Sequence, residues 1–156
     1  RNYDRPGRDF RFFNVAIANE DGPIKLFKNV NRSGTSGHSS LLLRHNDEHT
    51  TFNEDNFETV EGITYENWLK NFANEEPNVI VIDTEGFDYQ ILLQVYKSKT
   101  CPEIVVFERP GRDDDDVLNR FRSGMSTVKD VRTLFEPLGY EFKELEANMI
   151  LIKKPI

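Results

Sequence analysis

The stretch VIVIDTEGFDYQIL, residues 79–92, decides the fold. It opens with four uninterrupted apolar residues, a run that is typical of a strand buried on both faces of a sheet. Asp83, Glu85 and a glycine follow, and apolar residues then recur at helical spacing as far as Val95. A second apolar run, residues 104–107, comes after a short link. The pattern predicts a β-α-β unit with two parallel strands and a right-handed crossover.

Signals after and before this unit predict further helices and strands. Thr64 is suited to cap a helix that contains Trp68, and a Thr-x-x-Asp capping box begins a later helix at Thr127. Residues 140–145 and 148–152 then favour a closing antiparallel hairpin. Because strands alternate with helices, the predicted fold class is α/β.

The first third of the chain gives weaker signals. Residues 10–18 and 24–28 are strand-like runs separated by turn-forming residues, which predicts a β-hairpin. Residues 29–58 are polar and irregular, and a segment of this kind in a compact domain is typically functional or mobile. We expect it to be a mobile loop that acts as a lid. Residues 1–9 are polar and are expected to be a linker before one domain over residues 10–156.

Composition and charge limit the class of protein. The 156 residues include 20 Lys and Arg against 27 Asp and Glu, so the formal net charge is −7. Nucleic-acid binders need a basic surface to release counterions, which argues against a nucleic-acid partner. No apolar run approaches the roughly 18 residues that a membrane span needs. We expect a soluble, cytoplasmic protein with no membrane span.

Three carboxylates follow the two predicted parallel strands. Asp83 and Glu85 come directly after the first strand, and Glu108 ends the second. Ligands of open parallel sheets bind at the carboxyl ends of the strands. Carboxylates gathered there could raise one another's pKa, hold a cation or act as a general base. The alternative is that Asp83 and Glu85 cap the next helix and face water. Asp88 is expected to be structural, because it complements the helix dipole.

The histidines and the single cysteine, which are common metal ligands, are expected to have no catalytic role. His38, His45 and His49 lie in the polar segment, and Asn46 stands where a metalloprotease helix needs Glu. We interpret these histidines as solvated loop residues and expect no metal site. The single cysteine, Cys101, excludes an intrachain disulfide and is expected to be a buried, unreactive thiol.

The sequence resembles the FkbM-like methyltransferases over about residues 10–153. Residues 79–92 are similar to the family signature, in which an apolar strand precedes Asp-x-Glu-Gly, an aromatic residue, an acid and Ile-Leu. Ser39 and Ser40 resemble the serine pair of the family. Other segments that resemble the family in the same order are residues 14–18, 63–69, 105–108 and 138–140.

This resemblance implies a class I methyltransferase fold, which is a Rossmann-like and mostly parallel sheet with a C-terminal antiparallel hairpin. It implies S-adenosylmethionine as methyl donor and an O-methylation reaction on a hydroxyl of a small-molecule or glycan acceptor, such as a sugar or a secondary metabolite. The glycine-rich loop that binds the donor in this family has no counterpart in the sequence. We expect a partial domain whose N-terminal strands are missing, and whose exposed sheet edge favours self-association.

The resemblance also assigns site residues. Asp83 and Glu85 correspond to residues that border the methyl-transfer site, and Glu108 to the end of the neighbouring strand. Asn14 and Ala16 correspond to positions near the adenine part of the donor, and Asp83 is also expected to contact the donor. A carboxylate in this position serves as a general base for the acceptor hydroxyl.

Two alternatives from other classes stay open. The chain could be a non-catalytic binding or scaffold module that keeps the α/β frame and uses residues 29–58 as its contact surface. It could also be a divalent-metal-dependent enzyme with Asp83, Glu85 and Glu108 as oxygen ligands. Donor binding separates the methyltransferase from the first alternative, and stabilisation by metal ions would indicate the second.

Overall fold

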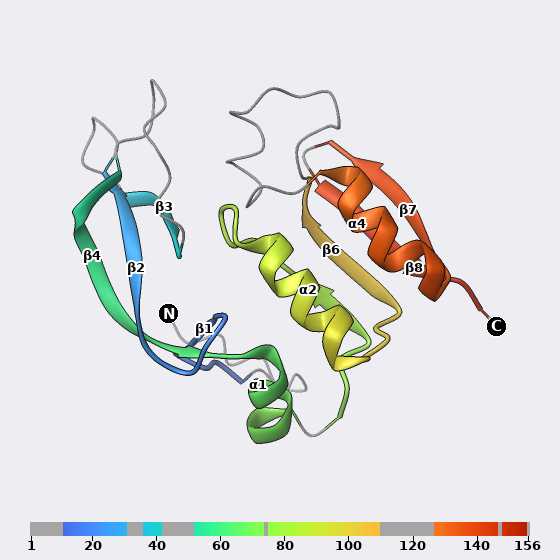
Figure 1. The fold of residues 1–156 in the computed structure, drawn as a ribbon, viewed down its shortest axis with the longest axis horizontal. Coiled ribbons are helices and arrows are strands. Elements are labelled where there is room, and N and C mark those ends of the chain that lie inside the picture. Colours follow the sequence, from blue (N-terminus) through green and yellow to red (C-terminus); the bar gives the residue numbers. More distant parts are fainter. Residues whose placement is uncertain are drawn as a thin grey trace, which may run out of the picture.

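The computed structural model of the chain (Figure 1) describes residues 11–30, 36–41, 52–73, 75–109, 127–146 and 148–155. The first half contains β1 (Ala16–Ile17), β2 (Gly22–Val30), β3 (Ser36–Ser40), β4 (Phe52–Ile63) and α1 (Tyr65–Phe72). The second half contains β5 (Val79–Val81), α2 (Asp88–Ser98), β6 (Ile104–Glu108), α4 (Val128–Phe135), the 3-10 helix η1 (Glu136–Leu138), β7 (Tyr140–Leu145) and β8 (Asn148–Lys153). The predicted α/β class is confirmed.

The second sheet, in the order β5-β6-β8-β7, carries the best-predicted part of the fold. β5 and β6 are parallel and flank α2 in the sequence, so the β-α-β unit is confirmed. β8 pairs with both β6 and β7 in antiparallel directions, which confirms the closing hairpin. The expected mostly parallel sheet is wrong for the described strands, because β8 also runs antiparallel to β6, and β2 runs antiparallel to both β3 and β4. Both sheets are mixed.

The first sheet, in the order β1-β4-β2-β3, differs from the sequence prediction. The predicted hairpin between residues 10–18 and 24–28 is wrong, because β1 pairs in parallel with β4, with Ala16 opposite Gly62. The described residues before β1, 11–15, do not pair with β2 either. Instead, the ring of Phe13 packs against Phe72 of α1, with the ring centroids 4.8 Å apart.

The polar segment 29–58 is not irregular throughout. β2 extends to Val30, residues 36–40 form β3, and β4 begins at Phe52. β2 and β4 are joined by a long antiparallel ladder, by a 2.7 Å ion pair between Lys28 and Glu58, and by a contact between Phe27 and Phe57. Cross-strand pairing rather than apolar periodicity thus forms these strands. The expected mobile stretches at 31–35 and 42–51, and the expected linker 1–9, lie outside the described residues.

The main apolar core lies between the second sheet and the helices α2 and α4, which lie side by side along it (Figure 1). Its fully buried side chains include Leu92 and Val95 of α2, Phe107 of β6 and Phe135 of α4. β5 is buried less than predicted, since Val79 and Val81 are 53% and 71% exposed. Within the described residues β5 pairs with β6 alone, so one edge and one face are uncovered. Self-association through this edge stays a prediction.

Candidate functional site

A tight turn joins β5 to α2. The peptide after β5 still belongs to the sheet, because Ile82 N donates to Val106 O at 2.8 Å. Glu85 and Gly86 then adopt φ angles of 52° and 97°. Glycine tolerates such angles, whereas Glu85 is strained there, and strained residues of this kind cluster at functional sites. The turn therefore presents an acidic residue in an unfavourable backbone conformation at the carboxyl end of a strand.

The carboxylate of Asp88 connects this turn to β6. Asp88 is the first residue of α2 and is 5% exposed. Its Oδ2 accepts a hydrogen bond from Thr84 Oγ1 at 2.8 Å, and its Oδ1 accepts one from Glu108 N at 3.2 Å. A buried carboxylate needs such partners, and the helix dipole adds to its stabilisation. The expected structural role of Asp88 therefore includes a link between the ends of two parallel strands.

Ser40 connects the first sheet to the same turn. It is the last residue of β3 and is 1% exposed. Its hydroxyl donates to the carbonyl oxygen of Glu85 at 2.9 Å, across 45 positions of sequence. In the sequence, Ser40 is distinguished only by its resemblance, together with Ser39, to the serine pair of the FkbM-like family. The structure shows that its hydroxyl contacts the main chain of the predicted site.

Helix capping does not account for Asp83 and Glu85. The N-cap residue of α2 is Phe87, and no side-chain hydrogen bond caps this helix. The acidic residue in the first turn is Asp88. The capping part of that alternative is therefore wrong, whereas Asp83 is exposed to water as it expected.

A cavity of about 750 Å³ lies beside the turn, between the two sheets and α1. Small-molecule and cofactor sites have volumes of roughly 300–1,000 Å³, so the cavity is of suitable size. The exposed face of β5 and the aromatic rings of Phe13, Tyr65 and Trp68 form apolar walls. Ser39, Asp83 and Thr84 contribute its polar atoms near the turn.

Tyr65 lies in this cavity as a neutral phenol. Its ring stacks on Trp68 with centroids 6.2 Å apart, and burial raises the pKa of its hydroxyl above the ordinary tyrosine value. The hydroxyl lies 3.4 Å from Thr100 Oγ1, within hydrogen-bonding distance. The stacked rings of Tyr65 and Trp68 thus form an apolar part of the cavity wall, in which Tyr65 itself is almost completely buried.

The cavity collects some of the predicted site residues but not all. Asp83 and Ala16 line it together, although they belong to different sheets. Asn14 is exposed and is not among the lining residues. Glu85 is half-buried in the turn, and Glu108 is exposed at the end of β6. Asp88 links the main chain of Glu108 to the turn that contains Glu85.

The described residues offer no metal centre. No group of three or more His, Cys, Asp or Glu side chains among them is placed to hold a metal ion. The alternative in which Asp83, Glu85 and Glu108 are metal ligands therefore has no support from their arrangement. His45 and His49 lie outside the described residues. The expectation for Cys101 is wrong, because this thiol is exposed.

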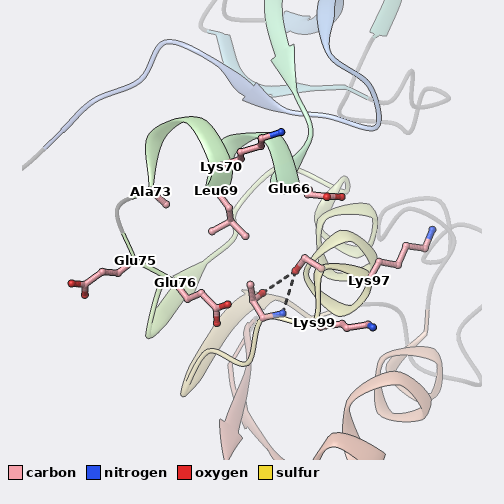
Figure 2. Close-up of a pocket in the computed structure, with 10 residues that line it drawn as sticks. Glu66, Leu69, Lys70, Ala73, Glu75, Glu76, Lys97 and Lys99 are labelled. Carbon is pink, nitrogen blue, oxygen red and sulfur yellow. Dashed lines mark hydrogen bonds between the residues drawn. The ribbon is translucent and has the colours of Figure 1, made fainter.

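A second cavity of about 570 Å³ lies near the C-terminal ends of α1 and α2 (Figure 2). Lysine and glutamate side chains surround it together, and Glu75 and Lys97 extend from opposite sides in the view. The hydroxyls of Ser98 and Thr100 in its wall are 2.9 Å apart and hydrogen-bond each other. Because its charges are of both signs and its hydroxyls already hydrogen-bond each other, this cavity favours no particular class of ligand. The first cavity is therefore the better candidate for the functional site.

One comparison with known proteins identifies a family for the chain. The family model of the methyltransferase FkbM domain matches residues 1–142, which include the turn and both parallel strands. No curated protein and no solved structure matches the chain. None of the helices in the described segments is long and apolar enough to cross a membrane. Because the family model covers more than half of the 156 residues, the chain belongs to the methyltransferase FkbM domain family.

Proposed function

We propose that the protein is an S-adenosylmethionine-dependent O-methyltransferase that methylates a hydroxyl of a sugar or of a secondary metabolite. The observation that carries this proposal is the strained acidic turn after β5, whose Asp83 opens onto a cavity of cofactor size. The chain's membership of a methyltransferase domain family supports the reaction type.

The residues around the cavity fit such a donor. When bound, S-adenosylmethionine supplies an electrophilic methyl group on a positively charged sulfur. The Asp83 carboxylate is suited to attract a cation, and its oxygens accept hydrogen bonds from hydroxyl or ammonium groups. The half-buried ring of Trp68 is suited to pack against an adenine base, and the small side chain of Ala16 also lines the cavity.

The chain's contribution to the reaction is positioning and proton removal. The acceptor hydroxyl must be aligned with the methyl carbon, because orientation accounts for much of the rate of such a transfer. We assign to Glu85 the role of general base, which would take the proton of the acceptor hydroxyl. Asp83 and Glu108 orient the reactants from the ends of the two parallel strands.

Titration calorimetry with S-adenosylhomocysteine tests donor binding. The titration is made into this chain and, separately, into the natural protein at its full length. Binding to either supports the methyltransferase. Absence of binding to both would transfer support to a non-catalytic binding module, for which the exposed Val79 and Val81 on β5 offer an apolar contact surface.

Glu85→Gln tests the base. The substitution keeps the shape of the side chain and removes its proton affinity, so we expect methyl transfer to fall by a factor of about 100 or more. Glu146→Gln is the matched control, because Glu146 has the same φ of 52° but lies in the turn between β7 and β8. Equal turnover in the two variants would contradict the role of Glu85.

A further inference from the structure

We propose that Ser40 and Asp88 are positioning residues that hold Glu85 and Glu108 in one fixed arrangement. The inference rests on the proposed function, because it concerns the two carboxylates assigned there. Ser40 and Asp88 belong to different elements, and both are almost completely buried. Neither is placed in contact with a substrate, so each acts through hydrogen bonds to its neighbours: Ser40 to the main chain of Glu85, and Asp88 to the Thr84 hydroxyl and the main chain of Glu108.

Asp88 fixes the two strand ends relative to each other. Each of its carboxylate oxygens accepts from a different element: Oδ2 from the Thr84 hydroxyl at 2.8 Å, and Oδ1 from Glu108 N at 3.2 Å. Hydrogen bonds to a charged acceptor are roughly twice as strong as neutral ones. A capping role alone would direct the carboxylate to the free N–H groups of its own helix. The bond to Glu108 N instead joins α2 to the end of β6.

Ser40 fixes the peptide plane after Glu85. The carbonyl of Glu85 accepts from Ser40 Oγ at 2.9 Å, and Glu85 has a φ of 52°. The cost of a left-handed conformation in a non-glycine residue is comparable to the net gain from one hydrogen bond. Loss of the Ser40 hydroxyl therefore shifts the turn toward other conformations, and the Glu85 side chain moves with it.

The kinetic consequence follows from the geometry that group transfer requires. A misplacement of about 1 Å in a reacting group can cost about 100-fold in rate. For Ser40→Ala and Asp88→Ala we expect kcat to fall by about 10- to 100-fold, with the KM for the donor changed by less than about 2-fold. Asp88→Asn keeps an acceptor for Glu108 N, so it is expected to recover part of the lost kcat.

Matched controls separate positioning from loss of stability. Asp130→Ala removes a carboxylate that accepts from a threonine hydroxyl and a main-chain N–H, like Asp88, but at the start of α4. Ser98→Ala removes a hydroxyl that donates to a carbonyl, like Ser40, but inside α2. We expect both controls to keep kcat within about 2-fold of the parent protein.

The experiment measures kcat, KM and amide hydrogen exchange over residues 83–88 in the full-length protein. Reduced kcat at unchanged KM, with faster exchange in Ser40→Ala and Asp88→Ala than in the controls, supports the proposal. Unchanged exchange in both variants overturns it. If the parent protein neither binds the donor nor transfers methyl groups, the proposed function fails, while the exchange measurement still tests whether Ser40 and Asp88 hold the turn.

Discussion

Replacement of Ser40 by alanine tests how strongly the two sheets are joined at the turn. The hydroxyl of this buried residue donates to the Glu85 carbonyl at 2.9 Å. Alanine removes that donor. A hydrogen bond of this kind contributes about 1 kcal/mol net, and a buried acceptor left without a partner costs roughly 1–3 kcal/mol. We expect the free energy of unfolding to fall by about 1–2 kcal/mol, and Tm to fall by roughly 2–4 °C for each kcal/mol.

The control for this variant is Ser98→Ala. The Ser98 hydroxyl also donates to a main-chain carbonyl, that of Val95, at 2.7 Å. That bond spans only three positions within α2 and lies at a half-buried residue, so water replaces the hydroxyl more easily. We expect its loss to cost less than about 1 kcal/mol. Ser98→Ala also removes the contact with Thr100 Oγ1, so a larger loss in Ser40→Ala would show that the contact from β3 to the turn is the stronger one.

Urea denaturation provides the measurement, with the fluorescence of Trp68, the single tryptophan, as one signal and circular dichroism as a second. Coincident transitions by the two signals would show that the sheets unfold together. If Ser40→Ala stays within about 0.3 kcal/mol of the parent protein, or matches Ser98→Ala, the reasoning about the turn is refuted.

Three further predictions concern stability. Burial raises the pKa of Tyr140 to about 12, so the free energy of unfolding should fall between pH 10 and pH 12. Urea unfolding of Tyr140→Phe should show a smaller decrease in the free energy of unfolding over that range. The N–H of Thr64 donates to the Asp21 carboxylate and lowers its pKa. The ionised carboxylate therefore stabilises the fold above pH 3.8, and this stabilisation is lost as the pH falls through the folded pKa of Asp21. Thermal unfolding of Asp21→Asn should lack that acid-dependent loss. Gly139→Ala should cost about 1 kcal/mol in urea unfolding, because φ is 83° and the added Cβ meets only Lys153 Nζ at 3.9 Å.

The second half of the fold was predictable because its signals are local. The apolar runs of β5 and β6, the helical spacing of α2 and the capping box at Thr127 each lie within about ten residues of sequence. Thr64 was also predicted correctly as the cap of α1, and its hydroxyl accepts from Asn67 N. Burial of β5 was not predictable, because an apolar run has the same composition whether one or both faces are covered.

The first sheet was not predictable because its pairing is non-local. Ala16 lies opposite Gly62, across 46 positions, whereas a sequence read for hairpins favours the neighbouring strand. β3 consists of SGHSS, which has neither alternation nor β-branched residues. Such a strand exists because β2 supplies its hydrogen-bond partners, and that contribution leaves no trace in its own sequence.

The candidate site was also predictable only in part, for the same reason. Asp83, Glu85 and Glu108 were found from the rule that ligands bind at the carboxyl ends of parallel strands. The hydrogen bonds of Ser40 and Asp88 to that site were not found, because each depends on how strands far apart in sequence are placed in space.

The hydrogen bond between Ser40 and Glu85 lies beside the first cavity, so ligand binding can affect it. Ala16 and Ser39 reach the cavity from the first sheet, and Asp83 reaches it from the end of β5 in the second. Ser40 lies next to Ser39 and bonds to the turn that contains Asp83. A ligand that fills the cavity therefore contacts both sheets beside the hydrogen bond that joins them. Because binding to the folded state alone stabilises it, the ligand and the Ser40 contact favour the same arrangement of Glu85.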